Sequence, residues 1–84
     1  METNYKGHAN ESGVYSITNT TNGRVYIGSA KRFKQRYSEH CKTLEKGTHH
    51  NKYLQHDWNK CGSSVFVFEV LEVVEGEQSV RLLV

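Results

Sequence analysis

Two short runs of β-branched and aromatic residues, separated by a turn-forming dipeptide, constrain this chain more than any other feature. The first run is GVYSITN, residues 13–19, and the second is RVYIGS, residues 24–29. Between them stands Asn22-Gly23, and both residues tolerate the positive φ that a type I′ turn requires. The sequence therefore predicts an antiparallel β-hairpin near the start of the fold.

A helical pattern follows the hairpin. Within residues 30–47, apolar or aromatic side chains recur every three or four residues, at Phe33, Tyr37, Cys41 and Leu44. Ser29 is expected to cap this helix, since a serine side chain can accept a bond from a free helical N–H. Lys46 in the last turn and Gly47 just after it favour the end of the helix there.

The rest of the chain predicts one more helix, one more strand and the opening of a third helix. The second helix is expected over residues 51–60, and the run SVFVFEVLEVV, residues 64–74, predicts a strand covered on much of both faces. Residues 78–84 have a helical pattern whose apolar end lacks a cap, as in a truncated helix. The expected fold is of the α/β (α+β) class, with a three-stranded, mainly antiparallel sheet flanked by helices.

Length and composition indicate one small soluble domain. The 84 residues are 36% hydrophobic and 24% charged, which fits a globular chain with a single core. Residues 1–11 show no periodicity and are expected to form a flexible lead-in, so that residues 12–84 make up the domain. No run is apolar enough for a signal peptide or a membrane span, and we expect a cytoplasmic, intracellular protein.

The cysteines and histidines do not predict a metal site. Cys41 and Cys61 lack a CxxC partner and are expected to be two buried, free thiols. The five histidines offer no HxxxH or HExxH spacing, and the adjacent pair His49 and His50 is expected to point in different directions.

Positive charge is concentrated in one stretch, although the formal net charge is only +2. Six of the eleven Lys and Arg residues fall within residues 31–46: Lys31, Arg32, Lys34, Arg36, Lys42 and Lys46. Such a stretch is usually a solvated helix face. It indicates a phosphate-binding surface only where other residues point to the same place.

Four side chains are the candidates for chemistry: Tyr15, Tyr26, Arg36 and His40. Each has an ordinary structural explanation when taken alone, because tyrosines are common in strands and helical arginines are usually solvated. Arg36 and His40 are four residues apart and therefore share one face of the predicted helix. Whether the two tyrosines converge depends on the register of the hairpin, which periodicity leaves open.

The order of these residues resembles the signature of the GIY-YIG nucleases, especially the catalytic domains of phage and group I intron homing endonucleases. The matching residues are Gly13-Val14-Tyr15, then Tyr26-Ile27-Gly28-Ser29, then Phe33, Arg36 and His40. Residues 51–62 and the strand over residues 64–74 are similar to the second helix and third strand of that family. The resemblance thus covers most of the chain.

This resemblance implies a DNA endonuclease that hydrolyses phosphodiester bonds with one divalent metal ion, usually Mg²⁺. Tyr15 matches the residue that takes part in activating the attacking water, and Tyr26 lies beside it in the family's site. Arg36 matches the arginine that stabilises charge on the phosphate, as a planar guanidinium does bidentately. His40 matches a histidine that hydrogen-bonds within the site. A free tyrosine is a poor base unless nearby cations lower its pKa.

The resemblance also implies supporting residues around this set. Gly13 and Gly28 are expected to allow close backbone approach near the site. Contacts with DNA are expected from Lys31, Arg32, Lys34 and Asn59. The alternative is a non-catalytic nucleic-acid-binding module that keeps the same fold.

The metal-binding glutamate that the resemblance implies would fall just past Val84, so the chain as given is expected to be impaired. Glu77 is the nearest candidate inside the chain. On a helix, however, it would lie about 12 Å too early along the axis, at 1.5 Å per residue. A solvated acid in the first helical turn is the simpler interpretation of Glu77.

Overall fold

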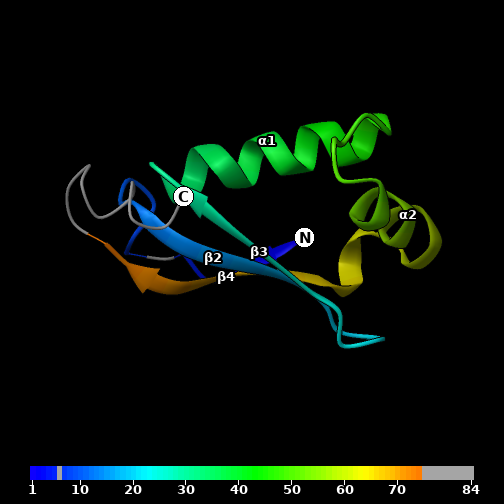
Figure 1. Cartoon of the computed structure of the whole chain (residues 1–84), viewed down its shortest axis with the longest axis horizontal. Coiled ribbons are helices and arrows are strands. Elements are labelled where there is room, and N and C mark those ends of the chain that lie inside the picture. The colour runs from blue at the N-terminus through cyan, green and yellow to red at the C-terminus, as the bar shows by residue number, and fades with distance from the viewer. Residues whose placement is uncertain (6, 75–84) are drawn as a thin grey trace.

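The computed structural model describes residues 1–5 and 7–74, which form a sheet with helices against it. Within these residues the sheet has four strands in the order β1-β4-β2-β3. Figure 1 shows α1 running along one face of the sheet, with α2 beyond one end. The predicted α/β class is therefore confirmed, and the expected third helix, residues 78–84, lies outside the described residues.

The predicted hairpin consists of β2, Gly13–Asn19, and β3, Val25–Ala30, which pair antiparallel. Its turn differs from the predicted type I′ turn, because Gly23 has a φ of 74° whereas Asn22 has a negative φ. The N–H of Gly23 donates to the Asn19 carbonyl at 2.8 Å, which closes a longer loop. The Asn22 side chain accepts a bond from the Arg24 N–H instead, a local interaction that competes with the two-residue turn.

The sheet has one strand more than predicted. Strand β4, Phe66–Val73, pairs antiparallel with β2, and β1, Glu2–Thr3, pairs parallel with the other edge of β4. Residues 2–3 therefore belong to the sheet rather than to a flexible lead-in. The physical reason is that an uncovered edge of β4 would present unpaired backbone groups, which the β1 segment satisfies.

Strand β4 begins later than predicted, because a 3₁₀ turn, η1, occupies Ser63–Val65. The strand has a neighbour on each side in the sheet, but it is not covered on much of both faces as predicted. Phe66 and Phe68 are fully buried, whereas Leu71 is 52% exposed. Since α1 covers only one face of the sheet (Figure 1), the last residues of β4 are not enclosed on both sides.

Helix α1 spans Phe33–Lys46 and starts without the predicted serine cap. Ser29 lies in β3, where it pairs with Val14, so the strand continues through the position expected to begin the helix. The end of α1 is as predicted, because Gly47 adopts a φ of 74° and its N–H donates to helical carbonyls.

Helix α2 spans Lys52–Cys61, one residue later at each end than predicted. The side chain of Asn51 caps it, since its Oδ1 accepts bonds from the N–H groups of Tyr53 and Leu54 at 3.0 and 3.1 Å. Gly62 follows the helix with a positive φ of 87°, which favours glycine, and its N–H donates to the Trp58 carbonyl. No helix within the described residues is long and apolar enough to cross a membrane.

The core lies between α1, α2 and the inner face of the sheet. Its fully buried hydrophobic members come from β2, β4 and both helices: Ile17, Phe33, Leu44, Leu54, Phe66 and Phe68. Both cysteines are free, as predicted, but they are half-buried rather than buried. The reason in α1 is that His40, not Cys41, turns toward the sheet. This buried histidine brings the polar residues of α1 to the hairpin.

Candidate active site

The four candidate residues line a single pocket between the hairpin, α1 and the start of α2. Tyr15 and Tyr26 reach it from β2 and β3, while Arg36 and His40 reach it from α1. The register explains this convergence, because Tyr26 pairs directly with Ile17, which shares a face of β2 with Tyr15. We call this cavity the relay pocket. Its other lining residues are Ile17, Ile27, Gly28, His49, His50, Asn51 and Leu54.

Tyr15 is the most enclosed of these side chains. Its ring stacks on Phe68 with the centres 4.6 Å apart, and its hydroxyl lies 2.6 Å from Nε2 of His40. Burial raises the pKa of the Tyr15 phenol above its ordinary value, and the charge of Arg36 only partly offsets that effect. Tyr15 is therefore a neutral phenol near pH 7, and the neighbouring cation does not turn it into a base.

Two glycines provide the space that the site requires. A Cβ atom at Gly28 would lie 2.4 Å from the Tyr15 hydroxyl oxygen, so this position of β3 must lack a side chain. A Cβ atom at Gly13 would lie 2.0 Å from the backbone oxygen of Glu72 in β4. Gly28 therefore makes room for the Tyr15 phenol, and Gly13 lets β2 approach β4 closely.

Tyr26 uses its hydroxyl differently from Tyr15. It donates a hydrogen bond at 2.8 Å to Oδ2 of Asp57, a buried residue of α2. Arg24 adds an ion pair, with its Nη1 3.8 Å from Oδ1 of the same carboxylate. Burial and the bond to Asp57 raise the pKa of Tyr26. Tyr26 thus ties β3 to α2 and directs its proton to Asp57.

Sequence reasoning missed Asp57, although a signal was available. The residue lies in the same helical stripe as Leu54 and Trp58, and an acid among apolar positions of a short helix rarely stays buried without a partner. Its partner Tyr26 comes from a strand 31 residues away, which no local pattern reveals.

His40 is buried against both Tyr15 and a second histidine. Its Nδ1 lies 2.7 Å from Nε2 of His49. Burial lowers the pKa of His40 to about 4, and the charges of His49 and Arg36 act in the same direction. Burial and His50 likewise lower the pKa of His49. Both rings are therefore neutral at physiological pH.

The prediction that His49 and His50 point in different directions is wrong. Their ring centres are 4.5 Å apart and nearly parallel, at 21°. The two residues lie at a bend between α1 and α2 rather than in a strand, so neighbouring side chains are not forced to opposite faces. His49 thereby enters the relay pocket, a placement that sequence periodicity did not indicate.

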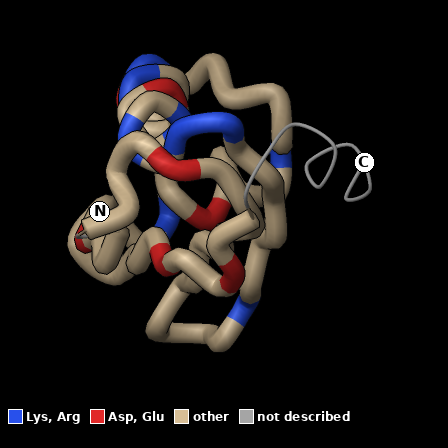
Figure 2. The backbone as a smooth tube through the Cα atoms, turned by 90° about the vertical axis from the view of Figure 1, so that its left-hand side faces the viewer, with Lys and Arg blue, Asp and Glu red and all other residues tan. Residues whose placement is uncertain are grey.

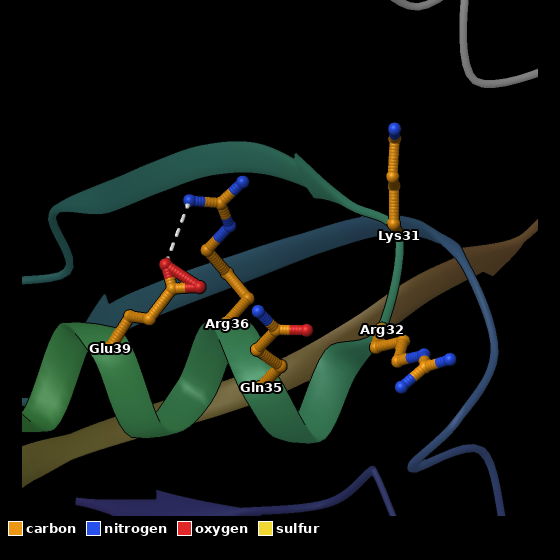
Figure 3. Close-up of a pocket in the computed structure, with 5 residues that line it drawn as sticks. All are labelled: Lys31, Arg32, Gln35, Arg36 and Glu39. Carbon is orange, nitrogen blue, oxygen red and sulfur yellow. Dashed lines mark ion pairs between the residues drawn. The ribbon is translucent and has the colours of Figure 1, made fainter.

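Arg36 is half-buried and borders a second, open cleft. Lys31, Arg32, Gln35 and Glu39 line this cleft with it, and we call the group the basic cleft. Figure 3 shows Arg36 and Glu39 extending alongside each other, with Nη1 of Arg36 3.6 Å from the Glu39 carboxylate. Arg36 thus lines both cavities and connects them.

The residues predicted to contact DNA do not all lie together. Lys31, Arg32 and Lys34 are exposed around the first turn of α1, and Figure 2 shows Lys and Arg positions gathering toward the part of the molecule that α1 occupies. Asn59 is exposed on α2, outside both cavities, where its Oδ1 accepts a bond from Gln55. The surface around α1 is therefore the stronger candidate for binding phosphates.

The described residues do not fit a magnesium site by themselves. Mg²⁺ prefers oxygen ligands that include carboxylates, whereas the relay pocket offers phenols, imidazoles, a guanidinium and an amide. No group of three or more His, Cys, Asp or Glu residues suited to a metal occurs within residues 1–5 and 7–74. Glu77, the candidate ligand from the sequence, lies outside the described residues.

This arrangement of strands and helices is that of a nuclease-type catalytic domain, because it superposes on the catalytic domain of a homing endonuclease. The chain belongs to the GIY-YIG family: the GIY-YIG catalytic domain matches residues 11–82. The resemblance seen in the sequence is thus confirmed.

Two named relatives and two solved structures support the assignment. The chain is 47% identical over 68 residues to intron-associated endonuclease 1 of Enterobacteria phage T4, covering 81% of this chain and 27% of the relative. It is 36% identical over 70 residues to a probable intron-encoded endonuclease 1 of Neurospora crassa, covering 83% of this chain and 22% of the relative. The chain thus spans about a quarter of the length of these relatives.

The solved structures are both of the I-TevI catalytic domain. The structure of the catalytic domain of homing endonuclease I-TevI superposes with a TM-score of 0.78 and 42% identity, covering 87% of this chain and 78% of that one. The E75A mutant of the catalytic domain of intron endonuclease I-TevI superposes with a TM-score of 0.74 and 47% identity, covering 81% of this chain and 69% of that one. Similarity at this level extends beyond the general fold to the sequence itself.

Proposed function

We propose that residues 12–84, together with β1 at the edge of the sheet, form the catalytic part of an intracellular homing endonuclease that hydrolyses phosphodiester bonds of DNA. The observation that carries the proposal is the meeting of Tyr15, Arg36 and His40 in one pocket beside an exposed basic cleft. The names of the relatives, both intron endonucleases, agree with it.

In this proposal Arg36 binds the phosphate that is cleaved. Its guanidinium is half-buried at the border of the two cavities, so it can face a phosphate from the basic cleft while its inner side remains next to Tyr15. A planar guanidinium binds two phosphate oxygens at once and stabilises the charge that gathers on them during displacement. The exposed pair with Glu39 is weak enough to be exchanged for a phosphate.

Tyr15 acts in its neutral form. Because burial raises its pKa, it holds its proton at physiological pH and can donate a hydrogen bond to the attacking water or to a phosphate oxygen. His40 holds the phenol in place through the 2.6 Å bond. Fixed geometry of this kind lowers the barrier by positioning.

The lysines and arginines around the first turn of α1 bind the DNA backbone in this proposal. Lys31 and Arg32 line the basic cleft with Arg36, and the exposed Lys34 lines a neighbouring cleft that Arg32 shares, so all three can contact phosphates near the one that is cleaved. Contacts of this kind position the duplex without reading its sequence, and their strength falls steeply with salt.

We also propose that cleavage needs a divalent cation, Mg²⁺ first. Such an ion supplies charge neutralisation at the phosphate and the leaving oxygen when bound. The relay pocket contains no carboxylate among its described lining residues, so we expect the ligand to come from a residue after Val84, with Glu77 as a weaker candidate. The 84-residue chain alone is then expected to cleave slowly or not at all.

Plasmid nicking tests this proposal. Supercoiled plasmid is incubated with Mg²⁺ and either the 84-residue chain or a version extended by about twenty further native residues, the reach of several helical turns. The extended protein is expected to nick the plasmid, and EDTA to stop it. No cleavage by the extended protein, or full cleavage by the 84-residue chain after Glu77→Gln substitution, would overturn the account of the metal ligand.

The second candidate is a nucleic-acid-binding module without catalysis, favoured by the same lack of a carboxylate in the described pocket. It predicts DNA binding that weakens with salt and does not respond to Mg²⁺ beyond the ionic-strength effect. Nicking that requires Mg²⁺ would exclude it.

A further inference from the structure

Three hydrogen bonds run in series from the start of α2 into the relay pocket. The backbone nitrogen of Asn51 lies 3.0 Å from Nδ1 of His49. Nε2 of His49 lies 2.7 Å from Nδ1 of His40, and Nε2 of His40 lies 2.6 Å from the Tyr15 hydroxyl. The planes of the two imidazole rings are nearly parallel, at 19°.

The first bond fixes the direction of the others. A backbone N–H can only donate, so Nδ1 of His49 must accept and carries no proton. A neutral His49 then carries its proton on Nε2, which donates to Nδ1 of His40. His40 in turn must carry its proton on Nε2, where it donates to the oxygen of Tyr15. Each imidazole has one donor and one acceptor, so no other neutral arrangement satisfies all three bonds.

The surroundings keep both rings neutral. His40 and His49 are only 8% and 7% exposed, and the charged neighbour Arg36 on α1 opposes a second proton. A doubly protonated His40 would also turn an Nδ1–H toward the Nε2–H of His49. The titratable groups that face the pair are Tyr15 from β2, Arg36 from α1 and His50 from the connecting bend, with Glu39 acting on Tyr15.

The residues at the origin of this series of bonds are held in place by their own partners. The Asn51 side chain caps α2, which fixes the direction of its backbone N–H. The buried Gln55 accepts a bond from the His49 N–H at 3.1 Å and donates one to the Leu44 carbonyl at 3.0 Å. Gln55 therefore fastens the bend to the end of α1.

We propose that His49 and the Asn51 N–H are positioning residues that select the tautomer of His40. In that tautomer His40 donates to Tyr15 and cannot accept its proton, so the phenolic proton of Tyr15 points into the pocket. The catalytic meaning rests on the proposed function, whereas the tautomers themselves do not.

The direct test is ¹⁵N NMR of the histidine rings at pH 7. We expect the proton on Nε2 in both His40 and His49. The couplings between ring nitrogens and ring carbon-bound protons should fit one tautomer for each ring. His56, which is exposed on α2, serves as the reference ring. A proton on Nδ1 of His40 would overturn the proposal, whatever the protein does to DNA.

Two variants of nearly equal size extend the test to function. His49→Gln places an amide near the Nε2 position and can still donate to His40, whereas His49→Glu in its ionised form can only accept. We expect His49→Gln to keep the Nε2–H tautomer of His40 and most of kcat. We expect His49→Glu to move the proton to Nδ1 of His40 and to lower kcat at least tenfold with KM for DNA unchanged.

Circular dichroism and thermal unfolding establish that both variants fold. Equal His40 tautomers in two folded variants would overturn the proposal. If no form of the protein cleaves DNA, the proposed function fails while the NMR result still decides the tautomers.

Discussion

The relay pocket and the basic cleft share Arg36, but the first also holds buried, neutral groups, whereas the other residues of the second are exposed and include two basic residues. In the relay pocket, burial holds Tyr15 and His40 neutral, and their positions are fixed by short hydrogen bonds. In the basic cleft, Lys31 and Arg32 are exposed, and the ion pair of Arg36 with Glu39 faces solvent. The relay pocket therefore fixes the positions of neutral groups, and the basic cleft provides positive charge.

This difference predicts that binding and chemistry can be separated by mutation. Exposed charges attract a polyanion over a distance but fix little geometry, and salt screens them. Buried neutral groups attract little, yet a small displacement among them changes the alignment of reacting atoms. Substitutions in the relay pocket should therefore lower turnover, and those in the basic cleft should lower affinity.

The largest effect is expected from Tyr15→Phe. The ring can still stack on Phe68, but the hydroxyl that faces the pocket is removed and the His40 donor is left without its acceptor. Removing one positioned donor costs roughly 10²–10³-fold in kcat. Single-turnover nicking by the extended protein measures it.

Tyr26→Phe is the matched control, because its hydroxyl bonds to Asp57 rather than to His40. The Tyr26→Phe variant should show a larger decrease in the free energy of unfolding than in kcat. Equal losses of turnover in the two variants would contradict the distinction between the phenols.

Gly28→Ala should act through Tyr15 without removing a polar atom. The added methyl would lie 2.4 Å from the phenol oxygen, so the ring must move out of its bond with His40. We expect kcat to fall by about 10²-fold, the size of effect that a misplacement of about 1 Å can have. Ser29→Ala, next to it in β3, should leave kcat within about twofold under the same assay.

The neutral histidines should make stability depend on pH. The pKa of His40 is about 4 in the folded protein against an ordinary value of 6.5, so between these values the unfolded chain binds a proton that the folded chain does not. The contribution of His40 to the free energy of unfolding is then fully present above about pH 6.5. It is lost as the pH drops toward about 4, and the loss is roughly 3 kcal/mol in all. Urea unfolding at pH 7.5 and pH 4.5 measures this change.

His40→Gln should flatten that dependence, whereas His56→Gln, at an exposed position of α2, should leave it as it is. A pH dependence that His40→Gln does not reduce would show that other groups cause it. His49 contributes in the same direction, since its pKa is also lowered.

The smallest effect on turnover is expected in the basic cleft. Lys31→Ala combined with Arg32→Ala should leave kcat near its original value and weaken DNA binding. The slope of log K against log salt should become less steep by about 0.9 for each phosphate that the variant no longer neutralises. Lys42→Ala combined with Lys46→Ala, in the later turns of α1, removes the same number of positive charges and should change the slope less. A fall in kcat with an unchanged slope would contradict the comparison.

Local patterns sufficed for the hairpin, both helices and the last strand, but not for β1. The hairpin runs, the stripe of α1 and the glycine after it are local signals, and they appear in the structure. The spacing of Arg36 and His40 also placed both on one helical face. Their resemblance to the GIY-YIG signature then linked them to the two tyrosines, which local periodicity alone left unconnected.

Other features depend on contacts between distant segments, and sequence reasoning missed them. Asp57 is buried only because Tyr26 reaches it, and His49 enters the pocket only because Gln55 holds the bend. The raised pKa of Tyr15 follows from how deeply α1 and Phe68 bury it. Such environments are properties of packing, which a one-dimensional pattern does not contain.

The central claim is that Arg36, where the two cavities meet, serves the reaction more than it serves binding. The most direct test measures the single-turnover nicking rate and the DNA Kd of Arg36→Ala side by side in the extended protein with Mg²⁺. The account predicts a rate at least 10²-fold lower with less than about a tenfold change in Kd. A variant that binds DNA poorly but nicks it at the original rate when saturated would contradict it.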